Sequence, residues 1–243
     1  MTRPVLLNNV DHGHLKVLTR RAAGPGDTAH HVLTFPTEFA DVQREYPILF
    51  RRHADTGEYQ AVALVGLAEG ENLFLDGDRW TGAYVPAIVA RGPFLIGFQE
   101  REVDGERRRQ PVVHIDLDDP RVNEREGEPL FLEHGGNAPY LQHVAGLLSV
   151  IQEGIETGKA MFAAFDTHGL LEPVNLEMDV LDDVRYVLRG YWTISRERLA
   201  ALDGTALADL NRAGFLEGAF LALASLANVP RLIDRKRRLL AGG

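Results

Sequence analysis

The chain has 243 residues, 45% of them hydrophobic and 25% charged, which is the composition of a globular protein with a sizeable core. Its formal net charge of −9 makes most of its surface repel a polyanion, so we expect no nucleic acid among its partners. The sequence contains no cysteine, which excludes disulfides, cysteine-ligated zinc and iron–sulfur clusters.

Two apolar stretches bear on the location of the protein. The amino-terminal apolar run stops at Asn8 and is too short for the hydrophobic region of a signal peptide. The most apolar stretch, residues 214–230, contains Glu217 and ends at Pro230, whereas a membrane-spanning helix needs about 20 mostly apolar residues. We interpret this stretch as a buried helix, and we expect a soluble cytoplasmic protein without a membrane span.

The first half of the chain has the pattern of antiparallel strands. Residues 46–66 hold two apolar runs around Ala-Asp-Thr-Gly, and residues 94–117 hold two more around Asp104-Gly105, a pair that favours a tight turn. Residues 35–47 predict a short helix that Thr37 caps and Pro47 ends.

The second half is mainly helical. Residues 138–158 predict a helix with one apolar stripe, made of Leu141, Val144, Leu148, Ile151 and Ile155. Residues 173–180 alternate strictly between apolar and polar side chains, which predicts a half-buried strand, and residues 184–194 are its expected hairpin partner. After Ser195, the expected N-cap of the first of them, we expect three further helices, separated by Gly204 and Gly214 where a helix would stop.

This order of elements predicts an α+β fold, with an antiparallel β-rich first half and a helix-rich second half packed on it. We expect a single domain over residues 1–243. A polar segment rich in glycine and proline, near residues 118–138, is the expected seam between the two halves.

Several sequence motifs resemble a known bacterial family. They are EFADVQREYPILF, the stretch from ALVGLAEGENLF to PFLIGF, IDLDDPRV, GLLEPVNLEMD, LRGYWTI and LNRAGFLEGAFLALASLANVPRL. In this order, over about residues 8–232, they resemble the SapC-like family. The family name comes from a surface-layer context, and some members are labelled peptide-transport permeases. The resemblance implies an accessory role in nutrient handling and carries no catalytic residue to this chain.

The aromatic and proline-rich segment 76–98 has two interpretations. As a binding surface, Trp80, Tyr84 and Phe94 would supply contact area, and Arg91 would clamp a carboxylate ligand. As a corner of the core, the same aromatic rings would be buried and Arg91 would pair with a nearby aspartate. Between these two interpretations, the residue types favour a corner of the core. Among the possible functions of the protein, a binding surface at this segment is the leading hypothesis.

A metal site is the second functional hypothesis. His114 and Asp116 form a His-x-Asp pair on a predicted strand, so both side chains point to one face. A distal histidine would complete the ligand set of a non-haem iron enzyme, and the candidates are His134, His143 and His168. The resemblance disfavours this site, because a small or apolar residue is expected at position 114. His30 and His31 are a poorer pair, since adjacent residues of a strand point to opposite faces.

We therefore expect a non-catalytic, cytoplasmic binding or accessory protein of SapC-like type without a cofactor, whose partner is an unidentified protein or small molecule. The alternatives are the metal-dependent enzyme using His114 and Asp116, and an oligomeric scaffold or surface-layer-associated protein. A homo-oligomer would form through the apolar carboxy-terminal helices.

Overall fold

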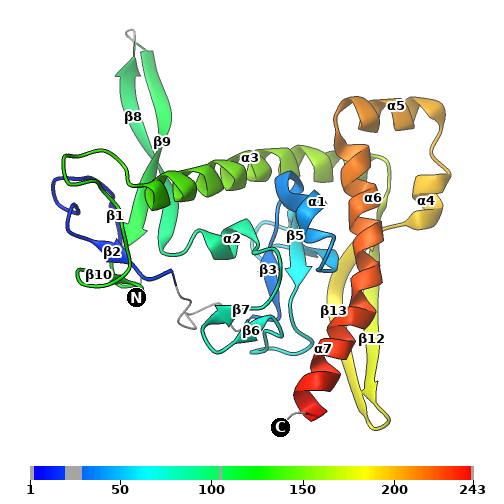
Figure 1. Cartoon of the computed structure of the whole chain (residues 1–243). Helices are drawn as coiled ribbons and strands as arrows, with labels where there is room; N and C mark the ends of the chain where they lie inside the picture. Colours follow the sequence, from blue (N-terminus) through cyan, green and yellow to red (C-terminus); the bar gives the residue numbers. More distant parts are fainter. Residues whose placement is uncertain (1–2, 20–28, 104–105, 242–243) are drawn as a thin grey trace. The chain divides into compact units, whose positions relative to one another are not determined.

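The computed structural model describes residues 3–19, 29–103 and 106–241 (Figure 1). The chain divides into two compact units: the first comprises residues 1–25, 77–79 and 87–152, and the second residues 26–76, 80–86 and 153–243. The expected seam at residues 118–138 lies within the first unit, and the single domain stays a prediction. The helices and antiparallel sheets confirm the α+β class. The expected turn at Asp104-Gly105 lies outside the described residues.

The first unit is built on the long β8–β9 ribbon. In its described residues, β1 and β8 flank β9, and a smaller sheet has the order β10-β2-β11. The strands of this unit are β1 (Pro4–Leu6), β2 (Lys16–Val17), β8 (Phe94–Val103), β9 (Glu106–Asp116), β10 (Val122–Asn123) and β11 (Glu128–Pro129). The short helix α2 (Ala87–Ala90) precedes β8 and is followed by Gly92, whose φ of +60° favours glycine.

The second unit contains an antiparallel sheet with the order β12-β13-β4-β5-β3 among the described residues. Its strands are β3 (His31–Leu33), β4 (Ile48–Arg52), β5 (Tyr59–Leu64), β12 (Leu171–Leu181) and β13 (Val184–Ile194). A separate short pair, β6 (Leu75–Asp76) and β7 (Arg79–Trp80), includes residues of both units.

The burial of these strands follows their sequence patterns. The apolar runs of β4 and β5 are continuous, and residues 48–50 and 61–64 are buried. The alternating residues of β12 face inward and outward in turn from Val174 to Val180, so the expected half-buried strand is confirmed. The three expected hairpin pairings, β4–β5, β8–β9 and β12–β13, are formed with antiparallel registers.

The helix boundaries correct two expectations. The segment after β3 begins with a 3-10 turn, η1 (Pro36–Glu38), and continues as α1 (Phe39–Val42). Phe35, not Thr37, is the N-cap residue, because Pro36 already has the backbone geometry of a first helical position. Gly204 begins α5 (Gly204–Arg212) rather than ending a helix, since the Asp203 carboxylate caps α5 by accepting from the Ala206 amide at 2.8 Å.

The long helix α3 (Pro139–Thr167) has its first part in the first unit and belongs to the second from Glu153 onward. Four members of its predicted stripe are buried, namely Leu141, Val144, Leu148 and Ile151. Ile155 is 40% exposed, so the stripe ends one turn earlier than expected.

The chain closes with a run of helices in the second unit: α4 (Arg196–Ala200), α5, α6 (Phe215–Ser225), the 3-10 turn η2 (Leu226–Asn228) and α7 (Val229–Ala241). Ser195 is the N-cap residue of α4, as expected, and Gly214, with a φ of +77°, separates α5 from α6.

Residues Phe215–Ala241 are the one helical stretch of the described chain that is long and apolar enough to cross a membrane. A core helix of a soluble protein passes the same test of length and composition, and 39% of the most apolar window is buried in the structure. Ala219, Ala222 and Leu223 are among its buried residues, and α6 packs against β4 and β13. The absence of a membrane span stays a prediction.

Gly154 of α3 gives a test of the packing in the second unit. A methyl group at position 154 would overlap Phe35 and lie 2.7 Å from the Thr37 hydroxyl oxygen. We expect Gly154→Ala to lower the free energy of unfolding by about 1–3 kcal/mol, measured by urea denaturation.

Gly158→Ala is the matched control in the same helix. There the added methyl group meets only Pro36 side-chain atoms, at 3.7 and 3.9 Å, so we expect a gain of up to about 1 kcal/mol from helix propensity. Equal stability of the two variants would contradict the contact between α3 and residues 35–37.

Candidate functional site

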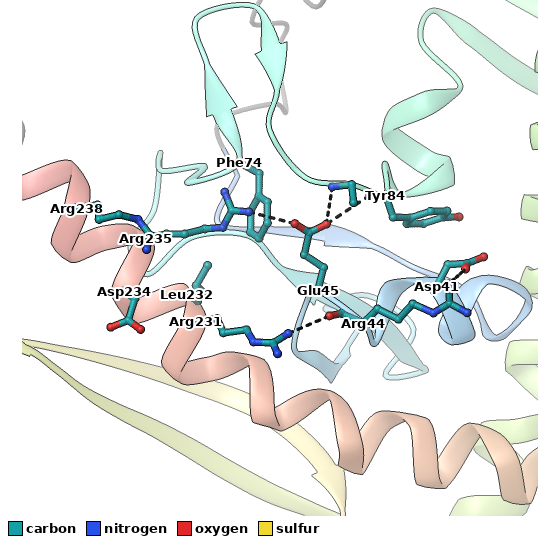
Figure 2. A pocket seen from close by; sticks show the side chains of 11 residues that line it. Asp41, Arg44, Glu45, Phe74, Tyr84, Arg231, Leu232, Asp234, Arg235 and Arg238 are labelled. Carbon is teal, nitrogen blue, oxygen red and sulfur yellow. Dashed lines mark hydrogen bonds and ion pairs between the residues drawn. The ribbon is translucent and has the colours of Figure 1, made fainter.

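A cavity of about 570 Å³ lies in the second unit, between α7, α1 and the loop that follows β7 (Figure 2). We call it the α7 pocket. It is lined by Asp41, Arg44, Glu45, Phe74, Ala83, Tyr84, Arg231, Leu232, Asp234, Arg235 and Arg238. The pocket thus combines a majority of charged side chains with a smaller number of aromatic and aliphatic ones.

Two buried polar side chains fix the carboxy-terminal helices against the connection between α1 and β4. The Ser225 hydroxyl accepts a hydrogen bond from the Ile48 amide at 2.8 Å and donates to the Ala222 carbonyl at 2.6 Å. The Asn228 amide donates to the Gln43 carbonyl at 2.7 Å. Both side chains are less than 5% exposed, and these bonds hold the start of α7 beside residues 43–48.

Glu45 lies at the centre of the α7 pocket and joins three segments of the chain (Figure 2). Its carboxylate accepts from the Ala83 amide at 2.7 Å, from the Tyr84 amide at 3.4 Å and from the Arg235 guanidinium at 3.1 Å. Arg235 also lies over the Phe74 ring, 4.0 Å from its centroid. The carboxylate therefore ties the loop after β7 to α7.

The loop after β7 is held from its other side by Trp80 and Tyr46. The Trp80 indole donates to the Tyr46 hydroxyl at 2.9 Å and to the Tyr84 carbonyl at 3.1 Å, and the Tyr46 hydroxyl donates to that same carbonyl. Burial raises the pKa of Tyr46 above its ordinary value, so its hydroxyl stays protonated as a donor. Trp80 stacks on Phe74 with ring centroids 5.9 Å apart. Trp80 is half-buried and supports the wall of the pocket from behind.

Tyr84 is the predicted binding residue that lines the pocket. Its hydroxyl donates to the Glu38 carboxylate at 2.7 Å, and the Thr34 hydroxyl donates to the same carboxylate at 2.9 Å. Burial, followed by the hydrogen bond to Glu38, raises the pKa of Tyr84. Glu38 is only 2% exposed, so this pair anchors the Tyr84 ring to η1.

The other two predicted binding residues, Arg91 and Phe94, belong to the first unit. Arg91 donates to the Phe94 carbonyl, and burial, followed by the nearby Arg121, lowers its pKa. Phe94 is fully buried and contacts the edge of the Tyr140 ring, so it is a core residue. The predicted segment thus divides, and only its Trp80–Tyr84 part adjoins the α7 pocket.

The predicted metal residues, His114 and Asp116, occupy structural positions at the end of β9. The Asp116 carboxylate accepts from the amides of Arg3 at 2.8 Å and Asp118 at 3.1 Å, as an aspartate at the end of a strand and the start of a turn does. The His114 ring lies over Gly97 of β8, where an added Cβ would overlap it. In the described residues, no group of three or more histidine and acidic side chains is arranged to hold a metal ion.

His30 and His31 do come together, contrary to the strand argument. His30 precedes β3, so its backbone does not alternate with His31, and His30 Nε2 and His31 Nδ1 are 3.2 Å apart. The Tyr191 hydroxyl lies 2.9 Å from His30 Nε2 and 3.1 Å from His31 Nδ1. Arg51 donates to His31 Nε2 at 2.9 Å, which assigns the proton of His31 to Nδ1. Periodicity could not find this cluster, because Tyr191 is 160 positions away.

The chain is thus an α+β protein with a cavity that ionisable, aromatic and aliphatic side chains line. A family model described as SapC matches residues 7–232, nearly the whole chain. The protein therefore belongs to the SapC family. No curated protein and no solved structure matches the chain.

The central role of Glu45 is testable by its removal. Glu45→Ala leaves the Arg235 guanidinium and the Ala83 amide without their acceptor, and we expect a loss of about 1–3 kcal/mol in the free energy of unfolding. The exposed Glu58→Ala should stay within about 0.5 kcal/mol of the wild type in the same urea titration. Similar losses in both variants would contradict the assignment.

The histidine cluster predicts acid sensitivity. The pKa of His31 is lowered from 6.5 to about 4 by burial first, and then by the nearby His30 and Arg51. Burial also lowers the pKa of His30, and the nearby Glu69 and Glu71 partly oppose that shift. The unfolded chain therefore binds protons that the folded protein excludes, and stability falls as the pH drops from about 6.5 toward 4. We expect His31→Gln to flatten this dependence of unfolding free energy on pH, and the exposed His143→Gln to leave it unchanged. An unaltered slope in His31→Gln would exclude the cluster as its cause.

Proposed function

We propose that this SapC-family protein is a binding or accessory protein of the cytoplasm that takes a ligand into the α7 pocket. The observation that carries the proposal is the fixed geometry of the pocket. Glu45, Trp80 and Tyr46 hold the loop wall by hydrogen bonds to its backbone, and Ser225 and Asn228 hold the helix wall. A preformed cavity reduces the ordering cost of binding.

The ionisable groups of the pocket favour binding over catalysis. Glu45 is engaged by Arg235 and two backbone amides, and the Tyr84 hydroxyl is committed to Glu38 with a raised pKa. A general base is instead expected to have a pKa near neutrality and access to the reacting proton. These side chains act in the proposal as supports that shape the cavity.

A second candidate function is the oligomeric scaffold. Phe220 on α6 is 55% exposed, and such a large apolar side chain on the surface of a helix suits a contact with a second copy. The cytoplasmic part of the proposal is supported by the burial of Ala219, Ala222 and Leu223 in α6 against the rest of the second unit, as in a core helix.

One experiment tests these proposals together. The tagged protein is recovered from the source cell after separation of the soluble and membrane fractions, and native mass spectrometry then reports its mass. We expect a soluble monomer carrying a small molecule that dissociates on unfolding. A ligand-free protein would contradict the binding function, recovery only with detergent would contradict the location, and a dimer would support the scaffold.

A further inference from the structure

The charges that line the α7 pocket do not cancel. Each lining carboxylate has an arginine partner: Glu45 pairs with Arg235 at 3.1 Å, Asp41 with Arg44 at 3.4 Å, and Asp234 with Arg237 at 3.1 Å. Arg237 does not line the cavity, but it neutralises a carboxylate that does. Two lining arginines, Arg231 and Arg238, then have no carboxylate partner among the described residues.

The two unmatched arginines differ in how they are held. Arg231 donates to neutral acceptors, the Arg44 carbonyl at 3.3 Å and the Asn228 side-chain oxygen at 3.1 Å, so its position is fixed while its charge remains uncompensated. Arg238 is exposed and forms no hydrogen bond or ion pair with any residue in the described part of the chain. Arg238 is therefore available to a ligand without the loss of an existing bond.

The spacing on α7 directs these side chains to one side. Arg231, Arg235 and Arg238 are separated by four and three residues, so they share a helix face over about 10 Å of helix length. Figure 2 shows Arg235 extending to Glu45 and Arg231 extending to Arg44, with Arg238 beside Arg235. The lining also has an apolar part, to which Leu232, Phe74 and the Tyr84 ring contribute.

We propose that the α7 pocket binds an amphiphilic anion, with a carboxylate or phosphate head at Arg238 and Arg231 and an apolar body along Leu232 and Tyr84. This inference rests on the proposed binding function and specifies its ligand class. Guanidinium groups suit such heads because they donate two parallel hydrogen bonds to carboxylate or phosphate oxygens.

The experiment measures the affinity of the full chain by isothermal titration calorimetry. The probes are octanoate, octyl phosphate, inorganic phosphate and neutral octanol. We expect octanoate or octyl phosphate to bind at least about 10-fold more tightly than octanol, because a hydrogen bond to a charged group is lost with the head. Arg238→Ala should weaken the anionic probes by about 10-fold or more and leave octanol unchanged.

Arg196→Ala is the matched control, because Arg196 is an exposed arginine on α4 of the same unit and does not line the pocket. It should bind all probes as the wild type does. Equal weakening by Arg196→Ala and Arg238→Ala would overturn the proposal in favour of non-specific attraction. If octanol binds as tightly as octanoate, the anionic ligand class is wrong and the binding function still stands. If no alkyl probe binds, the proposal is overturned.

Vesicles distinguish the source of the head group. Binding of the wild type but not of Arg238→Ala to vesicles of anionic phospholipid, with no binding to zwitterionic vesicles, would assign the ligand to a lipid surface. Binding only to the soluble anionic probes would assign it to a free metabolite. Either result supports the shared chemistry. Vesicle binding that Arg238→Ala leaves intact, without binding of the soluble probes, would overturn it.

Discussion

The α7 pocket depends on the buried hydrogen bonds that Ser225 and Asn228 make with residues 43–48. These side chains satisfy backbone groups that would otherwise be buried without partners, at a cost of about 1–3 kcal/mol each. They fix both the position and the rotation of α7 relative to α1 and β4. In the same arrangement Arg235 donates to the Glu45 carboxylate at 3.1 Å.

The loop from Trp80 to Tyr84 follows from that arrangement. Glu45 accepts from its amides on one side, while the Trp80 indole and the Tyr46 hydroxyl donate to the Tyr84 carbonyl on the other. Residues 81–86 have no regular secondary structure, so these side chains supply the partners that a strand or helix would provide. These hydrogen bonds hold the loop in one conformation, in which it forms a wall of the cavity.

The site residues were only partly accessible to sequence reasoning. Trp80 and Tyr84 were predicted as binding residues because they are aromatic residues near prolines. Tyr84 lines the pocket, and Trp80 supports its wall. Phe94 had the same local signal and lies in the core of the first unit, because local composition does not distinguish an aromatic ring in a wall from one in a core. Arg231 and Arg238 have no local signal, because only the structure shows that the carboxylates of the pocket are paired with other arginines.

The sequence by itself determined the α+β class, the three hairpin pairings, the alternating strand β12 and the resemblance to the SapC-like family. Each of these depends on local periodicity or on motifs in a fixed order. Tertiary structure alone decided which distant polar groups meet. Glu45 and Arg235 are 190 positions apart, Ile48 and Ser225 177, and His30 and Tyr191 161. Such pairs have no local signature, because they form only when packing of the apolar faces sets the distance and rotation between elements.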